Sequence, residues 1–342
     1  MNDPSKSLVP TLVADSVRLT DEGVDILDRR VFPLERRWVH CATVEDVAVA
    51  IEDMVTQSSG PFFAAAAGMV LAARQAAPSS DRVGHLELAA ARLVATRPTN
   101  NLVRQATDRM LAAAHAIGDD ASVAVAIEAA ARQAGDEYLE RSRQLGRHAA
   151  ALFEHGDAIL THCWGESYLT EAFAAAIRDG KSVTAMVTET RPYLQGARLT
   201  AESLGEIGVE VTVITDNMGA WAMAQGRVTR FVTAADRVTL DGHVVNKIGT
   251  LQLAIAARHH GIPYHALVHG PDLEAPTAAD VPIEERDGDE VLQVLGTRTA
   301  SRLAKGWYPA FDVTPPDLVT TVVTSRGTFE PGALRTRNWD DA

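Results

Sequence analysis

A repeated strand-then-helix pattern, which begins near Asp157, constrains the fold of this 342-residue chain more than any other feature. Short apolar runs end in polar residues, and a helical pattern follows each of the first runs. The expected strands cover residues 158–161, 182–187, 210–214, 230–233 and 263–267, with a last one at 318–324. Repeated units of this length predict a parallel sheet that is covered by helices.

The first part of the chain shows a different pattern. Expected strands at residues 17–19, 24–27 and 36–40 are followed by expected helices at 43–55, 62–76, 82–95, 102–117 and 121–153. Thr43 and Asp46 resemble a helix-capping box, and the last helix is expected to break or bend near Gly135 or Gly146. The chain is therefore expected to be an α/β protein. Its domains would be residues 1–140, with a small β element plus a helical bundle, and residues 141–342, with the parallel sheet.

The composition argues against several classes of partner. The formal net charge is −13 and no cluster of five or more basic residues occurs, so nucleic acid is not an expected partner. We expect no signal peptide and no membrane partner, because the most apolar helical stretch, residues 62–77, is too short to span a bilayer. Cys41 and Cys163 fit neither a disulfide framework nor a zinc site, so we expect reduced thiols in a cytoplasmic protein.

Side chains that could carry chemistry follow the expected strands directly. These side chains are Cys163, Glu189, Arg191, Asp216 and Asp236. Right-handed crossovers would place the carboxyl ends of the strands at one edge of the sheet, where ligands bind in open α/β folds. Cys163 also precedes an expected helix, whose dipole could stabilise a thiolate. The alternative for Cys163 is an inert, buried thiol.

The two aspartates have a structural alternative as helix N-caps. Asp216 is followed by a helical pattern, so both interpretations stay open for it. Asp236 is followed by extended residues, so capping explains it less well, and a buried carboxyl group there could act as an acid or a base. His162 adjoins Cys163, but neighbours on an extended strand point to opposite faces, which disfavours a Cys–His pair. The glycine-rich nucleotide-binding fingerprints are absent.

Two further segments could bind an anion. Asn246 and Lys247 stand just before an expected helix, whose first amides could hold an anion or a polyol. Arg97 precedes another expected helix and could supply a guanidinium group for a phosphate. The alternative for Arg97 is a surface salt bridge.

Several segments, taken in order, resemble the methylthioribose-1-phosphate isomerase family. They are ILDRRVFPLERRWVHCAT, RPTNNL, ILTHC, TETRPYLQGARLTAESL, VITDNM, AADR, NKIGTLQLAIAARHHGIPY, VPIEER and YPAFDVTPPDLVTTVVTSRG, and they span residues 15–332. That family belongs to a superfamily with ribose-1,5-bisphosphate isomerases and regulatory subunits of a translation-factor exchange complex. The resemblance implies a Rossmann-like C-terminal sheet with helices on both faces.

The resemblance also implies an activity. It implies an aldose–ketose isomerase that converts a pentose 1-phosphate, either S-methyl-5-thioribose 1-phosphate or a related 5-modified ribose derivative, to the ribulose form. Cys163 and Asp236 match the catalytic pair, and Arg97, Gln195, Asn246 and Lys247 match substrate-binding residues. The family uses no metal and no nucleotide cofactor and is usually homodimeric. A role in methionine salvage follows for the family's usual substrate.

The chain departs from the family at two places near the implied substrate. The family's arginine-containing phosphate loop is replaced by residues 56–61, which include Ser58, Ser59 and Gly60 but no arginine. Trp164 and Glu166 stand where the family has asparagine and small residues. These departures predict a paralogue that acts on a different pentose derivative. The alternative is a non-catalytic ligand-sensing regulatory protein, which the retained Cys163 and Asp236 disfavour.

Overall fold

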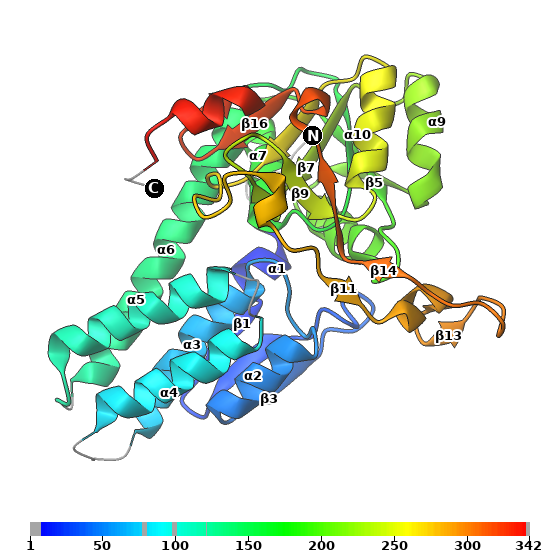
Figure 1. Cartoon of the computed structure of the whole chain (residues 1–342). Coiled ribbons are helices and arrows are strands. Elements are labelled where there is room, and N and C mark those ends of the chain that lie inside the picture. Colours follow the sequence, from blue (N-terminus) through cyan, green and yellow to red (C-terminus); the bar gives the residue numbers. More distant parts are fainter. Residues whose placement is uncertain (1–7, 77–80, 98–100, 121, 340–342) are drawn as a thin grey trace. The chain divides into compact units, whose positions relative to one another are not determined.

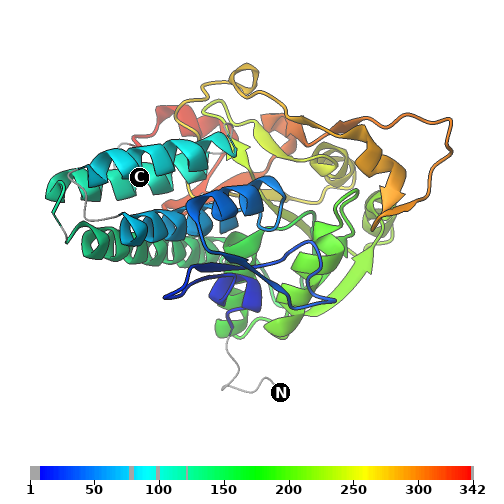
Figure 2. The ribbon, with the colours of Figure 1, turned by 90° about the horizontal axis from the view of Figure 1, so that it is seen from below.

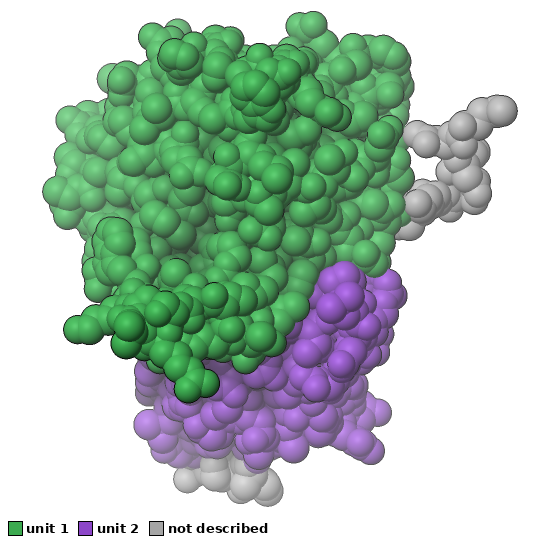
Figure 3. Space-filling model, turned by 90° about the vertical axis from the view of Figure 1, so that its right-hand side faces the viewer, with its two compact units in different colours: residues 1–10, 141–342 green, residues 11–140 purple. Residues whose placement is uncertain are grey.

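The computed structural model describes residues 8–76, 81–97, 101–120 and 122–339 and shows a mixed α/β fold (Figure 1). The chain divides into two compact units, residues 11–140 and residues 1–10 together with 141–342 (Figure 3). The expected α/β class with a largely parallel central sheet is confirmed. Among the described residues, no helix is long and apolar enough to cross a membrane.

The unit of residues 11–140 contains an antiparallel three-stranded sheet and a group of helices. The strands, in spatial order, are β1 (Val17–Leu19), β2 (Val24–Leu27) and β3 (Trp38–Cys41). The helices are α1 (Thr11–Ala14), α2 (Val44–Glu52), α3 (Gly60–Gln75), α4 (Arg82–Ala95), α5 (Asn101–Ile117) and the first part of α6 (Val123–Ala150). The expected strands and helices are confirmed, with small shifts at their ends.

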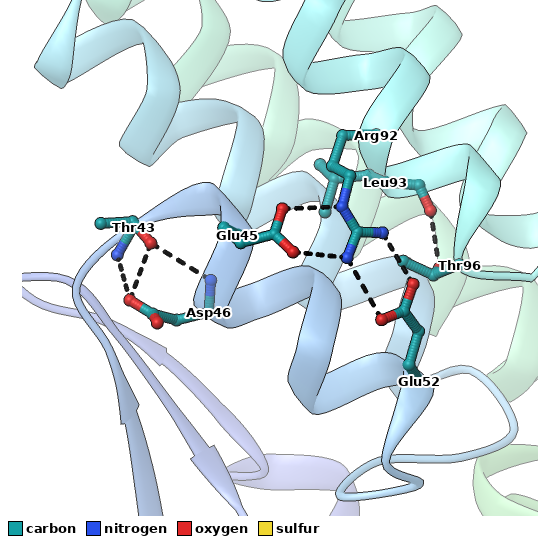
Figure 4. Close-up of polar contacts among 7 residues, drawn as sticks. All are labelled: Thr43, Glu45, Asp46, Glu52, Arg92, Leu93 and Thr96. Carbon is teal, nitrogen blue, oxygen red and sulfur yellow. Dashed lines mark hydrogen bonds and ion pairs between the residues drawn. The ribbon is translucent and has the colours of Figure 1, made fainter.

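Local interactions explain how α2 begins and how it is joined to α4. Thr43 and Asp46 form the expected capping box, in which each side chain bonds the other residue's backbone N–H (Figure 4). Arg92 of α4 bonds the carboxylates of Glu45 and Glu52, both on α2 (Figure 4). Since these pairs are solvent-exposed, they contribute little to stability, and the buried apolar faces of the helices hold the unit together.

The long helix α6 is unbroken, so the expected break near Gly135 or Gly146 is wrong. Gly146 serves a close approach instead. A Cβ atom at this position would lie only 2.6 Å from the backbone of Glu171 in α7 (Glu166–Arg178). Glycine is therefore required here by helix packing, and the helix tolerates it because tertiary contacts outweigh the loss of about 1 kcal/mol of helix propensity.

The second unit is built on a seven-stranded sheet. Its strands, in spatial order, are β17 (Gly327–Phe329), β16 (Thr321–Thr324), β10 (Tyr264–Leu267), β7 (Arg230–Ala234), β4 (Ala158–Thr161), β5 (Thr184–Thr188) and β6 (Glu210–Ile214). All neighbours pair in parallel except β17, which is antiparallel to β16. In chain order the parallel strands run 3-2-1-4-5-6, the order of a doubly wound sheet, and its direction of winding reverses between β4 and β7.

The alternating side chains of the strands bury two separate apolar cores. Ile159 and Val232 face one core with residues of α7 and α8 (Ala201–Glu206). Leu160 and Phe231, their neighbours in the same strands, face the other core with residues of α9 (Gly219–Ala224) and α10 (Thr250–His259). Burial on both faces explains why these strands are continuously apolar in sequence.

Short strands extend the second unit beyond the main sheet. A three-stranded sheet has the order β15 (Phe311–Thr314), β9 (Val244–Lys247) and β8 (Arg237–Val238). Two-stranded pairs join β11 (Glu285–Arg286) to β14 (Tyr308–Pro309) and β12 (Gln293–Val294) to β13 (Thr297–Arg298). The segment that carries β11 to β14 is drawn in orange and extends away from the main sheet in both views (Figures 1 and 2).

Candidate active site

Cys163 and Asp236 lie at the carboxyl ends of two neighbouring parallel strands. Cys163 follows β4 and Asp236 follows β7, and the two strands pair directly, with Leu160 opposite Phe231. The winding of the sheet reverses between these strands. In open α/β sheets such a switch point leaves a crevice at the carboxyl edge, where ligands bind.

The backbone of Cys163 is held in an unusual conformation. Its φ of 68° lies in the left-handed region, which residues with a side chain rarely adopt. The N–H of Cys163 donates to Oγ1 of Thr190 at 2.9 Å, and its carbonyl oxygen accepts from Oγ1 of Thr200 at 2.5 Å. Both threonines belong to the connection between β5 and α8, so this connection fixes the direction of the thiol. Backbone strain of this kind is often found at functional sites.

The thiol of Cys163 has an electrostatic environment with opposing effects. Burial raises its pKa, whereas the charges of Lys247 and Arg286 and the backbone N–H of Trp164 act to lower it. Cys41, by contrast, is fully buried, and burial raises its pKa to about 11. Cys41 is therefore an inert core thiol, and Cys163 is the cysteine with cations close to its sulfur.

Asp236 is placed in the same electrostatic environment. Part of its surface is exposed, yet the surrounding protein removes enough water to raise the pKa of its carboxyl group. The charges of Arg237 and Lys247 act in the opposite direction, and that of Glu284 adds to the rise. A carboxyl group with a raised pKa can hold a proton near neutral pH and give it to a substrate.

Lys247 connects the two groups. The residue is 5% exposed, and its Nζ lies 4.7 Å from the ring centre of Phe311. Burial lowers the pKa of Lys247, while the charges of Cys163 and Asp236 act to raise it. One buried cation therefore stabilises the anionic forms of both the thiol and the carboxyl group.

The prediction that the first backbone amides of α10 bind an anion is wrong, because those amides are already occupied. The first amides of the helix are already bonded by a carboxylate, because Asp312 accepts the N–H of Gly249 at 2.7 Å and that of Leu251 at 3.1 Å. Asn246 is buried and donates through Nδ2 to Oγ1 of Thr250 at 3.0 Å. A ligand near Asn246 and Lys247 would therefore meet their side chains and not the helix terminus.

Three other sequence-predicted residues are buried in this unit. Gln195 is 2% exposed, and its Oε1 has no hydrogen-bond partner among the described residues. Trp164 is 5% exposed, and its Nε1 is likewise without a described partner. Glu166, which is also buried, begins α7 with a φ of 43°. Buried polar atoms usually have partners, so the bare atoms of Gln195 and Trp164 point to binding of a polar ligand.

Asp216 acts on the backbone of a neighbouring loop. Its two carboxylate oxygens accept the N–H groups of Thr190 and Arg191, each at 2.7 Å. The alternative interpretation of Asp216 as a helix cap is also wrong, because Thr215 precedes the short 3₁₀ turn there and no side-chain capping bond forms. Asp216 thus holds the loop whose Thr190 bonds Cys163. The charge of Asp216 also adds to the effect of burial in raising the pKa of Glu189.

His162 is engaged away from Cys163. Its Nδ1 lies 2.6 Å from Oγ1 of Thr188, and its Nε2 lies 2.9 Å from the carbonyl oxygen of Ile248. Burial lowers the pKa of His162, so the ring is neutral near pH 7. Both ring nitrogens are therefore used to join β4 to β5 and to the loop before α10.

The other sequence-predicted residues belong to the unit of residues 11–140. Ser58 is exposed with a φ of 59°, and Ser59 is buried directly before α3. Gly60 begins α3, where a Cβ atom would overlap Oγ1 of Thr56. Arg97 donates through Nη2 to the carbonyl oxygen of Ile51 at 3.3 Å and contacts the sulfur of Met54. Residues 98–100 of the RPTNNL segment lie outside the described residues.

Arg29 is a cation beside this loop that sequence reasoning missed. It is fully buried, and its guanidinium group donates to the carbonyl oxygen of Gln57. Its Nη2 lies 3.0 Å from the position that a Cβ atom on Gly60 would take. The loop that lacks an arginine of its own is therefore packed against one from the segment after β2. A contact between such distant residues has no signal in a single sequence.

Arg286, Tyr308 and Glu284 also belong to the surroundings of Cys163 and were not singled out from the sequence. Arg286 donates through Nε to Glu284 at 2.9 Å, and its charge acts on both Cys163 and Asp236. They lie in the VPIEER and YPAFD segments, which carried the family resemblance without an assigned role. Within the described part of the chain, no group of three or more His, Cys, Asp or Glu side chains could hold a metal ion.

Comparisons with known proteins show what the whole chain is similar to. The model of the initiation factor 2 subunit family matches residues 57–331. A methylthioribose-1-phosphate isomerase from Thermosipho africanus is 37% identical over 324 residues, which cover 91% of this chain and 94% of the relative.

Two solved structures are similar over nearly the whole length. The structure of 5-methylthioribose 1-phosphate isomerase from Pyrococcus horikoshii has a TM-score of 0.87 at 32% identity and covers 96% of each chain. The structure of translation initiation factor eIF-2B, subunit delta, from A. fulgidus has a TM-score of 0.83 at 33% identity and covers 93% of this chain and 96% of that chain.

Proposed function

Because the chain belongs to the initiation factor 2 subunit family and is an isomerase, we propose that it converts a pentose 1-phosphate into the corresponding ribulose 1-phosphate. We propose Cys163 and Asp236 as its acid–base pair. The observation that carries this proposal is their position at the carboxyl ends of β4 and β7, on either side of the switch point, with the buried Lys247 acting on both.

The reaction needs an acid as well as a base, because an aldose 1-phosphate is locked as a cyclic acetal. Asp236 gives its proton to the ring oxygen as the bond between C1 and that oxygen breaks. The thiolate of Cys163 takes the proton from C2, which leaves an enol, and then returns it to C1. Asp236 takes the proton of the C2 hydroxyl as the ketone forms. Both groups return to their starting forms, so the sequence of steps consumes no co-reactant.

The raised pKa of Asp236 supports its role as an acid, whereas the raised pKa of Cys163 opposes its role as a base. A raised pKa favours the protonated form of Asp236, which its role as an acid requires. The raised pKa of Cys163 disfavours the thiolate, so Lys247 and Arg286 are needed to counteract the effect of burial. Only a fraction of the enzyme molecules then has a protonated Asp236 and a Cys163 thiolate together. The rate of the reaction therefore depends on Lys247 and Arg286, which increase this fraction.

The remaining sequence-predicted residues are proposed to bind the substrate, as the family resemblance implies. Gln195, Asn246, Lys247 and Trp164 would contact the sugar. Arg97, with Ser58, Ser59 and Gly60, would contact its phosphate. Glu166 would disfavour an anion close to it by a few kcal/mol at an effective dielectric of about 20. We infer that the substrate is S-methyl-5-thioribose 1-phosphate, as in methionine salvage, or a related 5-modified pentose 1-phosphate.

Several properties accompany this proposal. We propose a cytoplasmic homodimer whose partner is the small-molecule sugar phosphate, with structural domains at residues 1–140 and 141–342. A second candidate function, a ligand-sensing regulator without catalysis, is favoured by one observation, the similarity to subunit delta of eIF-2B. The cluster of Cys163, Asp236 and Lys247 favours the enzyme, because a sensor has no need for a paired thiol and acid.

A panel of pentose 1-phosphates tests the proposal. The purified chain is incubated with S-methyl-5-thioribose 1-phosphate, 5-deoxyribose 1-phosphate, ribose 1-phosphate and ribose 1,5-bisphosphate, and the ketose carbonyl carbon is followed by ¹³C NMR. We expect conversion of at least one member. Binding of a sugar phosphate without any conversion would support the regulator. If the chain neither binds nor converts any member of the panel, both functions are refuted.

A further inference from the structure

Tyr308 carries a buried hydroxyl group whose O–H has no acceptor among the described residues. Only 3% of the residue is exposed, and Oη makes no hydrogen bond of ordinary geometry, although the guanidinium group of Arg286 lies close enough to act on it as a donor. Tyr264, which is also buried, differs in this respect, because its Oη lies 2.8 Å from Oγ1 of Thr233. Buried hydroxyl groups in folded proteins nearly always have a partner. Arginine can only donate, so the O–H of Tyr308 has no acceptor among the described residues, and this points to an acceptor that the chain does not itself supply.

The surroundings of Tyr308 place it in the cluster around Cys163. Tyr308 of β14 is the cross-strand partner of Arg286 in β11. The Nζ of Lys247 lies 5.9 Å from the centre of the Tyr308 ring. The charges of Arg286 and Cys163 also act on the phenol group. The short β11–β14 pair thus presents Tyr308 to the same groups that surround the thiol.

The hydroxyl group of Tyr308 is a neutral donor at physiological pH. Burial raises its pKa to about 12, so the group keeps its proton. The unpartnered Nε1 of Trp164 is a second donor beside Cys163, and the unpartnered Oε1 of Gln195 is an acceptor. A ligand with several hydroxyl groups can satisfy such a set, because each hydroxyl both donates and accepts. An apolar ligand would leave these atoms without partners.

We propose that Tyr308 is a further substrate-contacting residue, whose hydroxyl group donates a hydrogen bond to the C2 or C3 hydroxyl of the sugar beside Cys163. This inference rests on the proposed isomerase function and deepens it. Tyr308 makes the site selective for pentose derivatives that keep this hydroxyl. A site built to bond a hydroxyl group discriminates strongly against the analogue without it, because a buried polar group is then left unpaired.

The variant Tyr308→Phe tests this contact, because it removes the hydroxyl and keeps the ring that packs near Lys247. With the pentose 1-phosphate that the wild type converts best, we expect kcat/KM to fall at least tenfold, mainly through a higher KM. The melting temperature should change little, since no hydrogen bond of ordinary geometry is lost. The matched control is Tyr264→Phe, which removes a hydroxyl that does have a partner. It should lower the melting temperature and leave kcat/KM of the folded enzyme unchanged.

Deoxy analogues identify the bonded hydroxyl. The inhibition constants of the 2-deoxy and 3-deoxy pentose 1-phosphates are measured with both the wild type and Tyr308→Phe. We expect the analogue that lacks the contacted hydroxyl to bind the wild type and the variant equally. The analogue that keeps this hydroxyl should bind the variant more weakly than the wild type. Equal weakening of both analogues, or a kcat/KM of Tyr308→Phe within twofold of wild type, would overturn the inference alone. Failure of the wild type to convert any pentose 1-phosphate would overturn the proposed function and this inference together.

Discussion

Asp312 accepts the backbone N–H of Gly249 at 2.7 Å, and this bond occupies the start of α10 with a carboxylate from the chain itself. Burial raises the pKa of Asp312 to about 6, although the bonds from Gly249 and Leu251 and the charge of Lys247 act to lower it. The group is partly exposed, so its ionisation costs of the order of 1–2 kcal/mol.

The pH dependence of stability tests this arrangement. A carboxyl group whose pKa is raised on folding binds more protons in the native state between pH 4 and 6, so its contribution to stability falls as pH rises through that range. Asp312→Asn cannot ionise and loses this dependence. We therefore expect the difference in melting temperature, wild type minus variant, to be larger at pH 4 than at pH 7. A difference that is constant with pH would show that Asp312 has an ordinary pKa.

His265 should produce the opposite pH dependence. It is buried, neither of its ring nitrogens has a partner among the described residues, and burial lowers its pKa to about 4. The unfolded chain takes up a proton at this histidine near pH 6.5, so stability falls as pH decreases from 6.5 to 4. His265→Leu should raise the free energy of unfolding at pH 7 by about 1 kcal/mol and flatten this fall. Urea unfolding at pH 7 and at pH 4 measures the effect. A variant that is less stable than the wild type at pH 7 would contradict this prediction.

Gly196 should be required by the loop that holds Cys163. A Cβ atom at this position would overlap the carbonyl oxygen of Thr188, so Gly196→Ala must displace the backbone. We expect a loss of about 1–3 kcal/mol of stability and a lower kcat, because Thr190 and Thr200 on either side bond Cys163. The matched control is Gly205→Ala in α8, where a Cβ atom would meet nothing within 4 Å. The control should be neutral or up to about 1 kcal/mol more stable. Equal effects of the two changes would refute this account.

Lys247 should set the reactivity of Cys163. Lys247→Met keeps much of the side-chain volume but removes the cation that lowers the pKa of the thiol. We expect the pH at which iodoacetamide alkylates Cys163 half-maximally to rise, and kcat/KM to fall about 100-fold or more. Lys305→Met changes an exposed lysine and is the matched control. An unchanged alkylation profile for Lys247→Met would mean that Lys247 does not act on the thiol.

Much of the fold follows from the sequence because its signals are local. The strand-then-helix rhythm predicted the parallel strands and the edge at which Cys163 and Asp236 lie. The capping box at Thr43 was visible as a pair of residues three positions apart. The break expected at Gly146 does not occur, because a glycine in a helix can mark either a break or a close contact, and the contact with Glu171 comes from a distant part of the chain.

The site could be predicted less completely than the fold. Asp216 is among the side chains that directly follow an expected strand, but its carboxylate bonds the backbone of the loop at Thr190 and Arg191. Arg29, Arg286 and Tyr308 were missed, because they approach loops and strands far away in the sequence. Asp312 had no signal as a helix cap either, since it lies on another strand, 63 positions beyond Gly249.

The central claim is that Cys163 and Asp236 exchange protons with a pentose 1-phosphate. NMR turnover of the best substrate by the wild type, Cys163→Ser and Asp236→Asn tests it most directly. We predict ketose formation by the wild type and at least a 1,000-fold lower rate for each variant, about 4 kcal/mol in activation free energy, with circular dichroism spectra and melting temperatures close to wild type. Turnover by either folded variant within tenfold of wild type would contradict the claim.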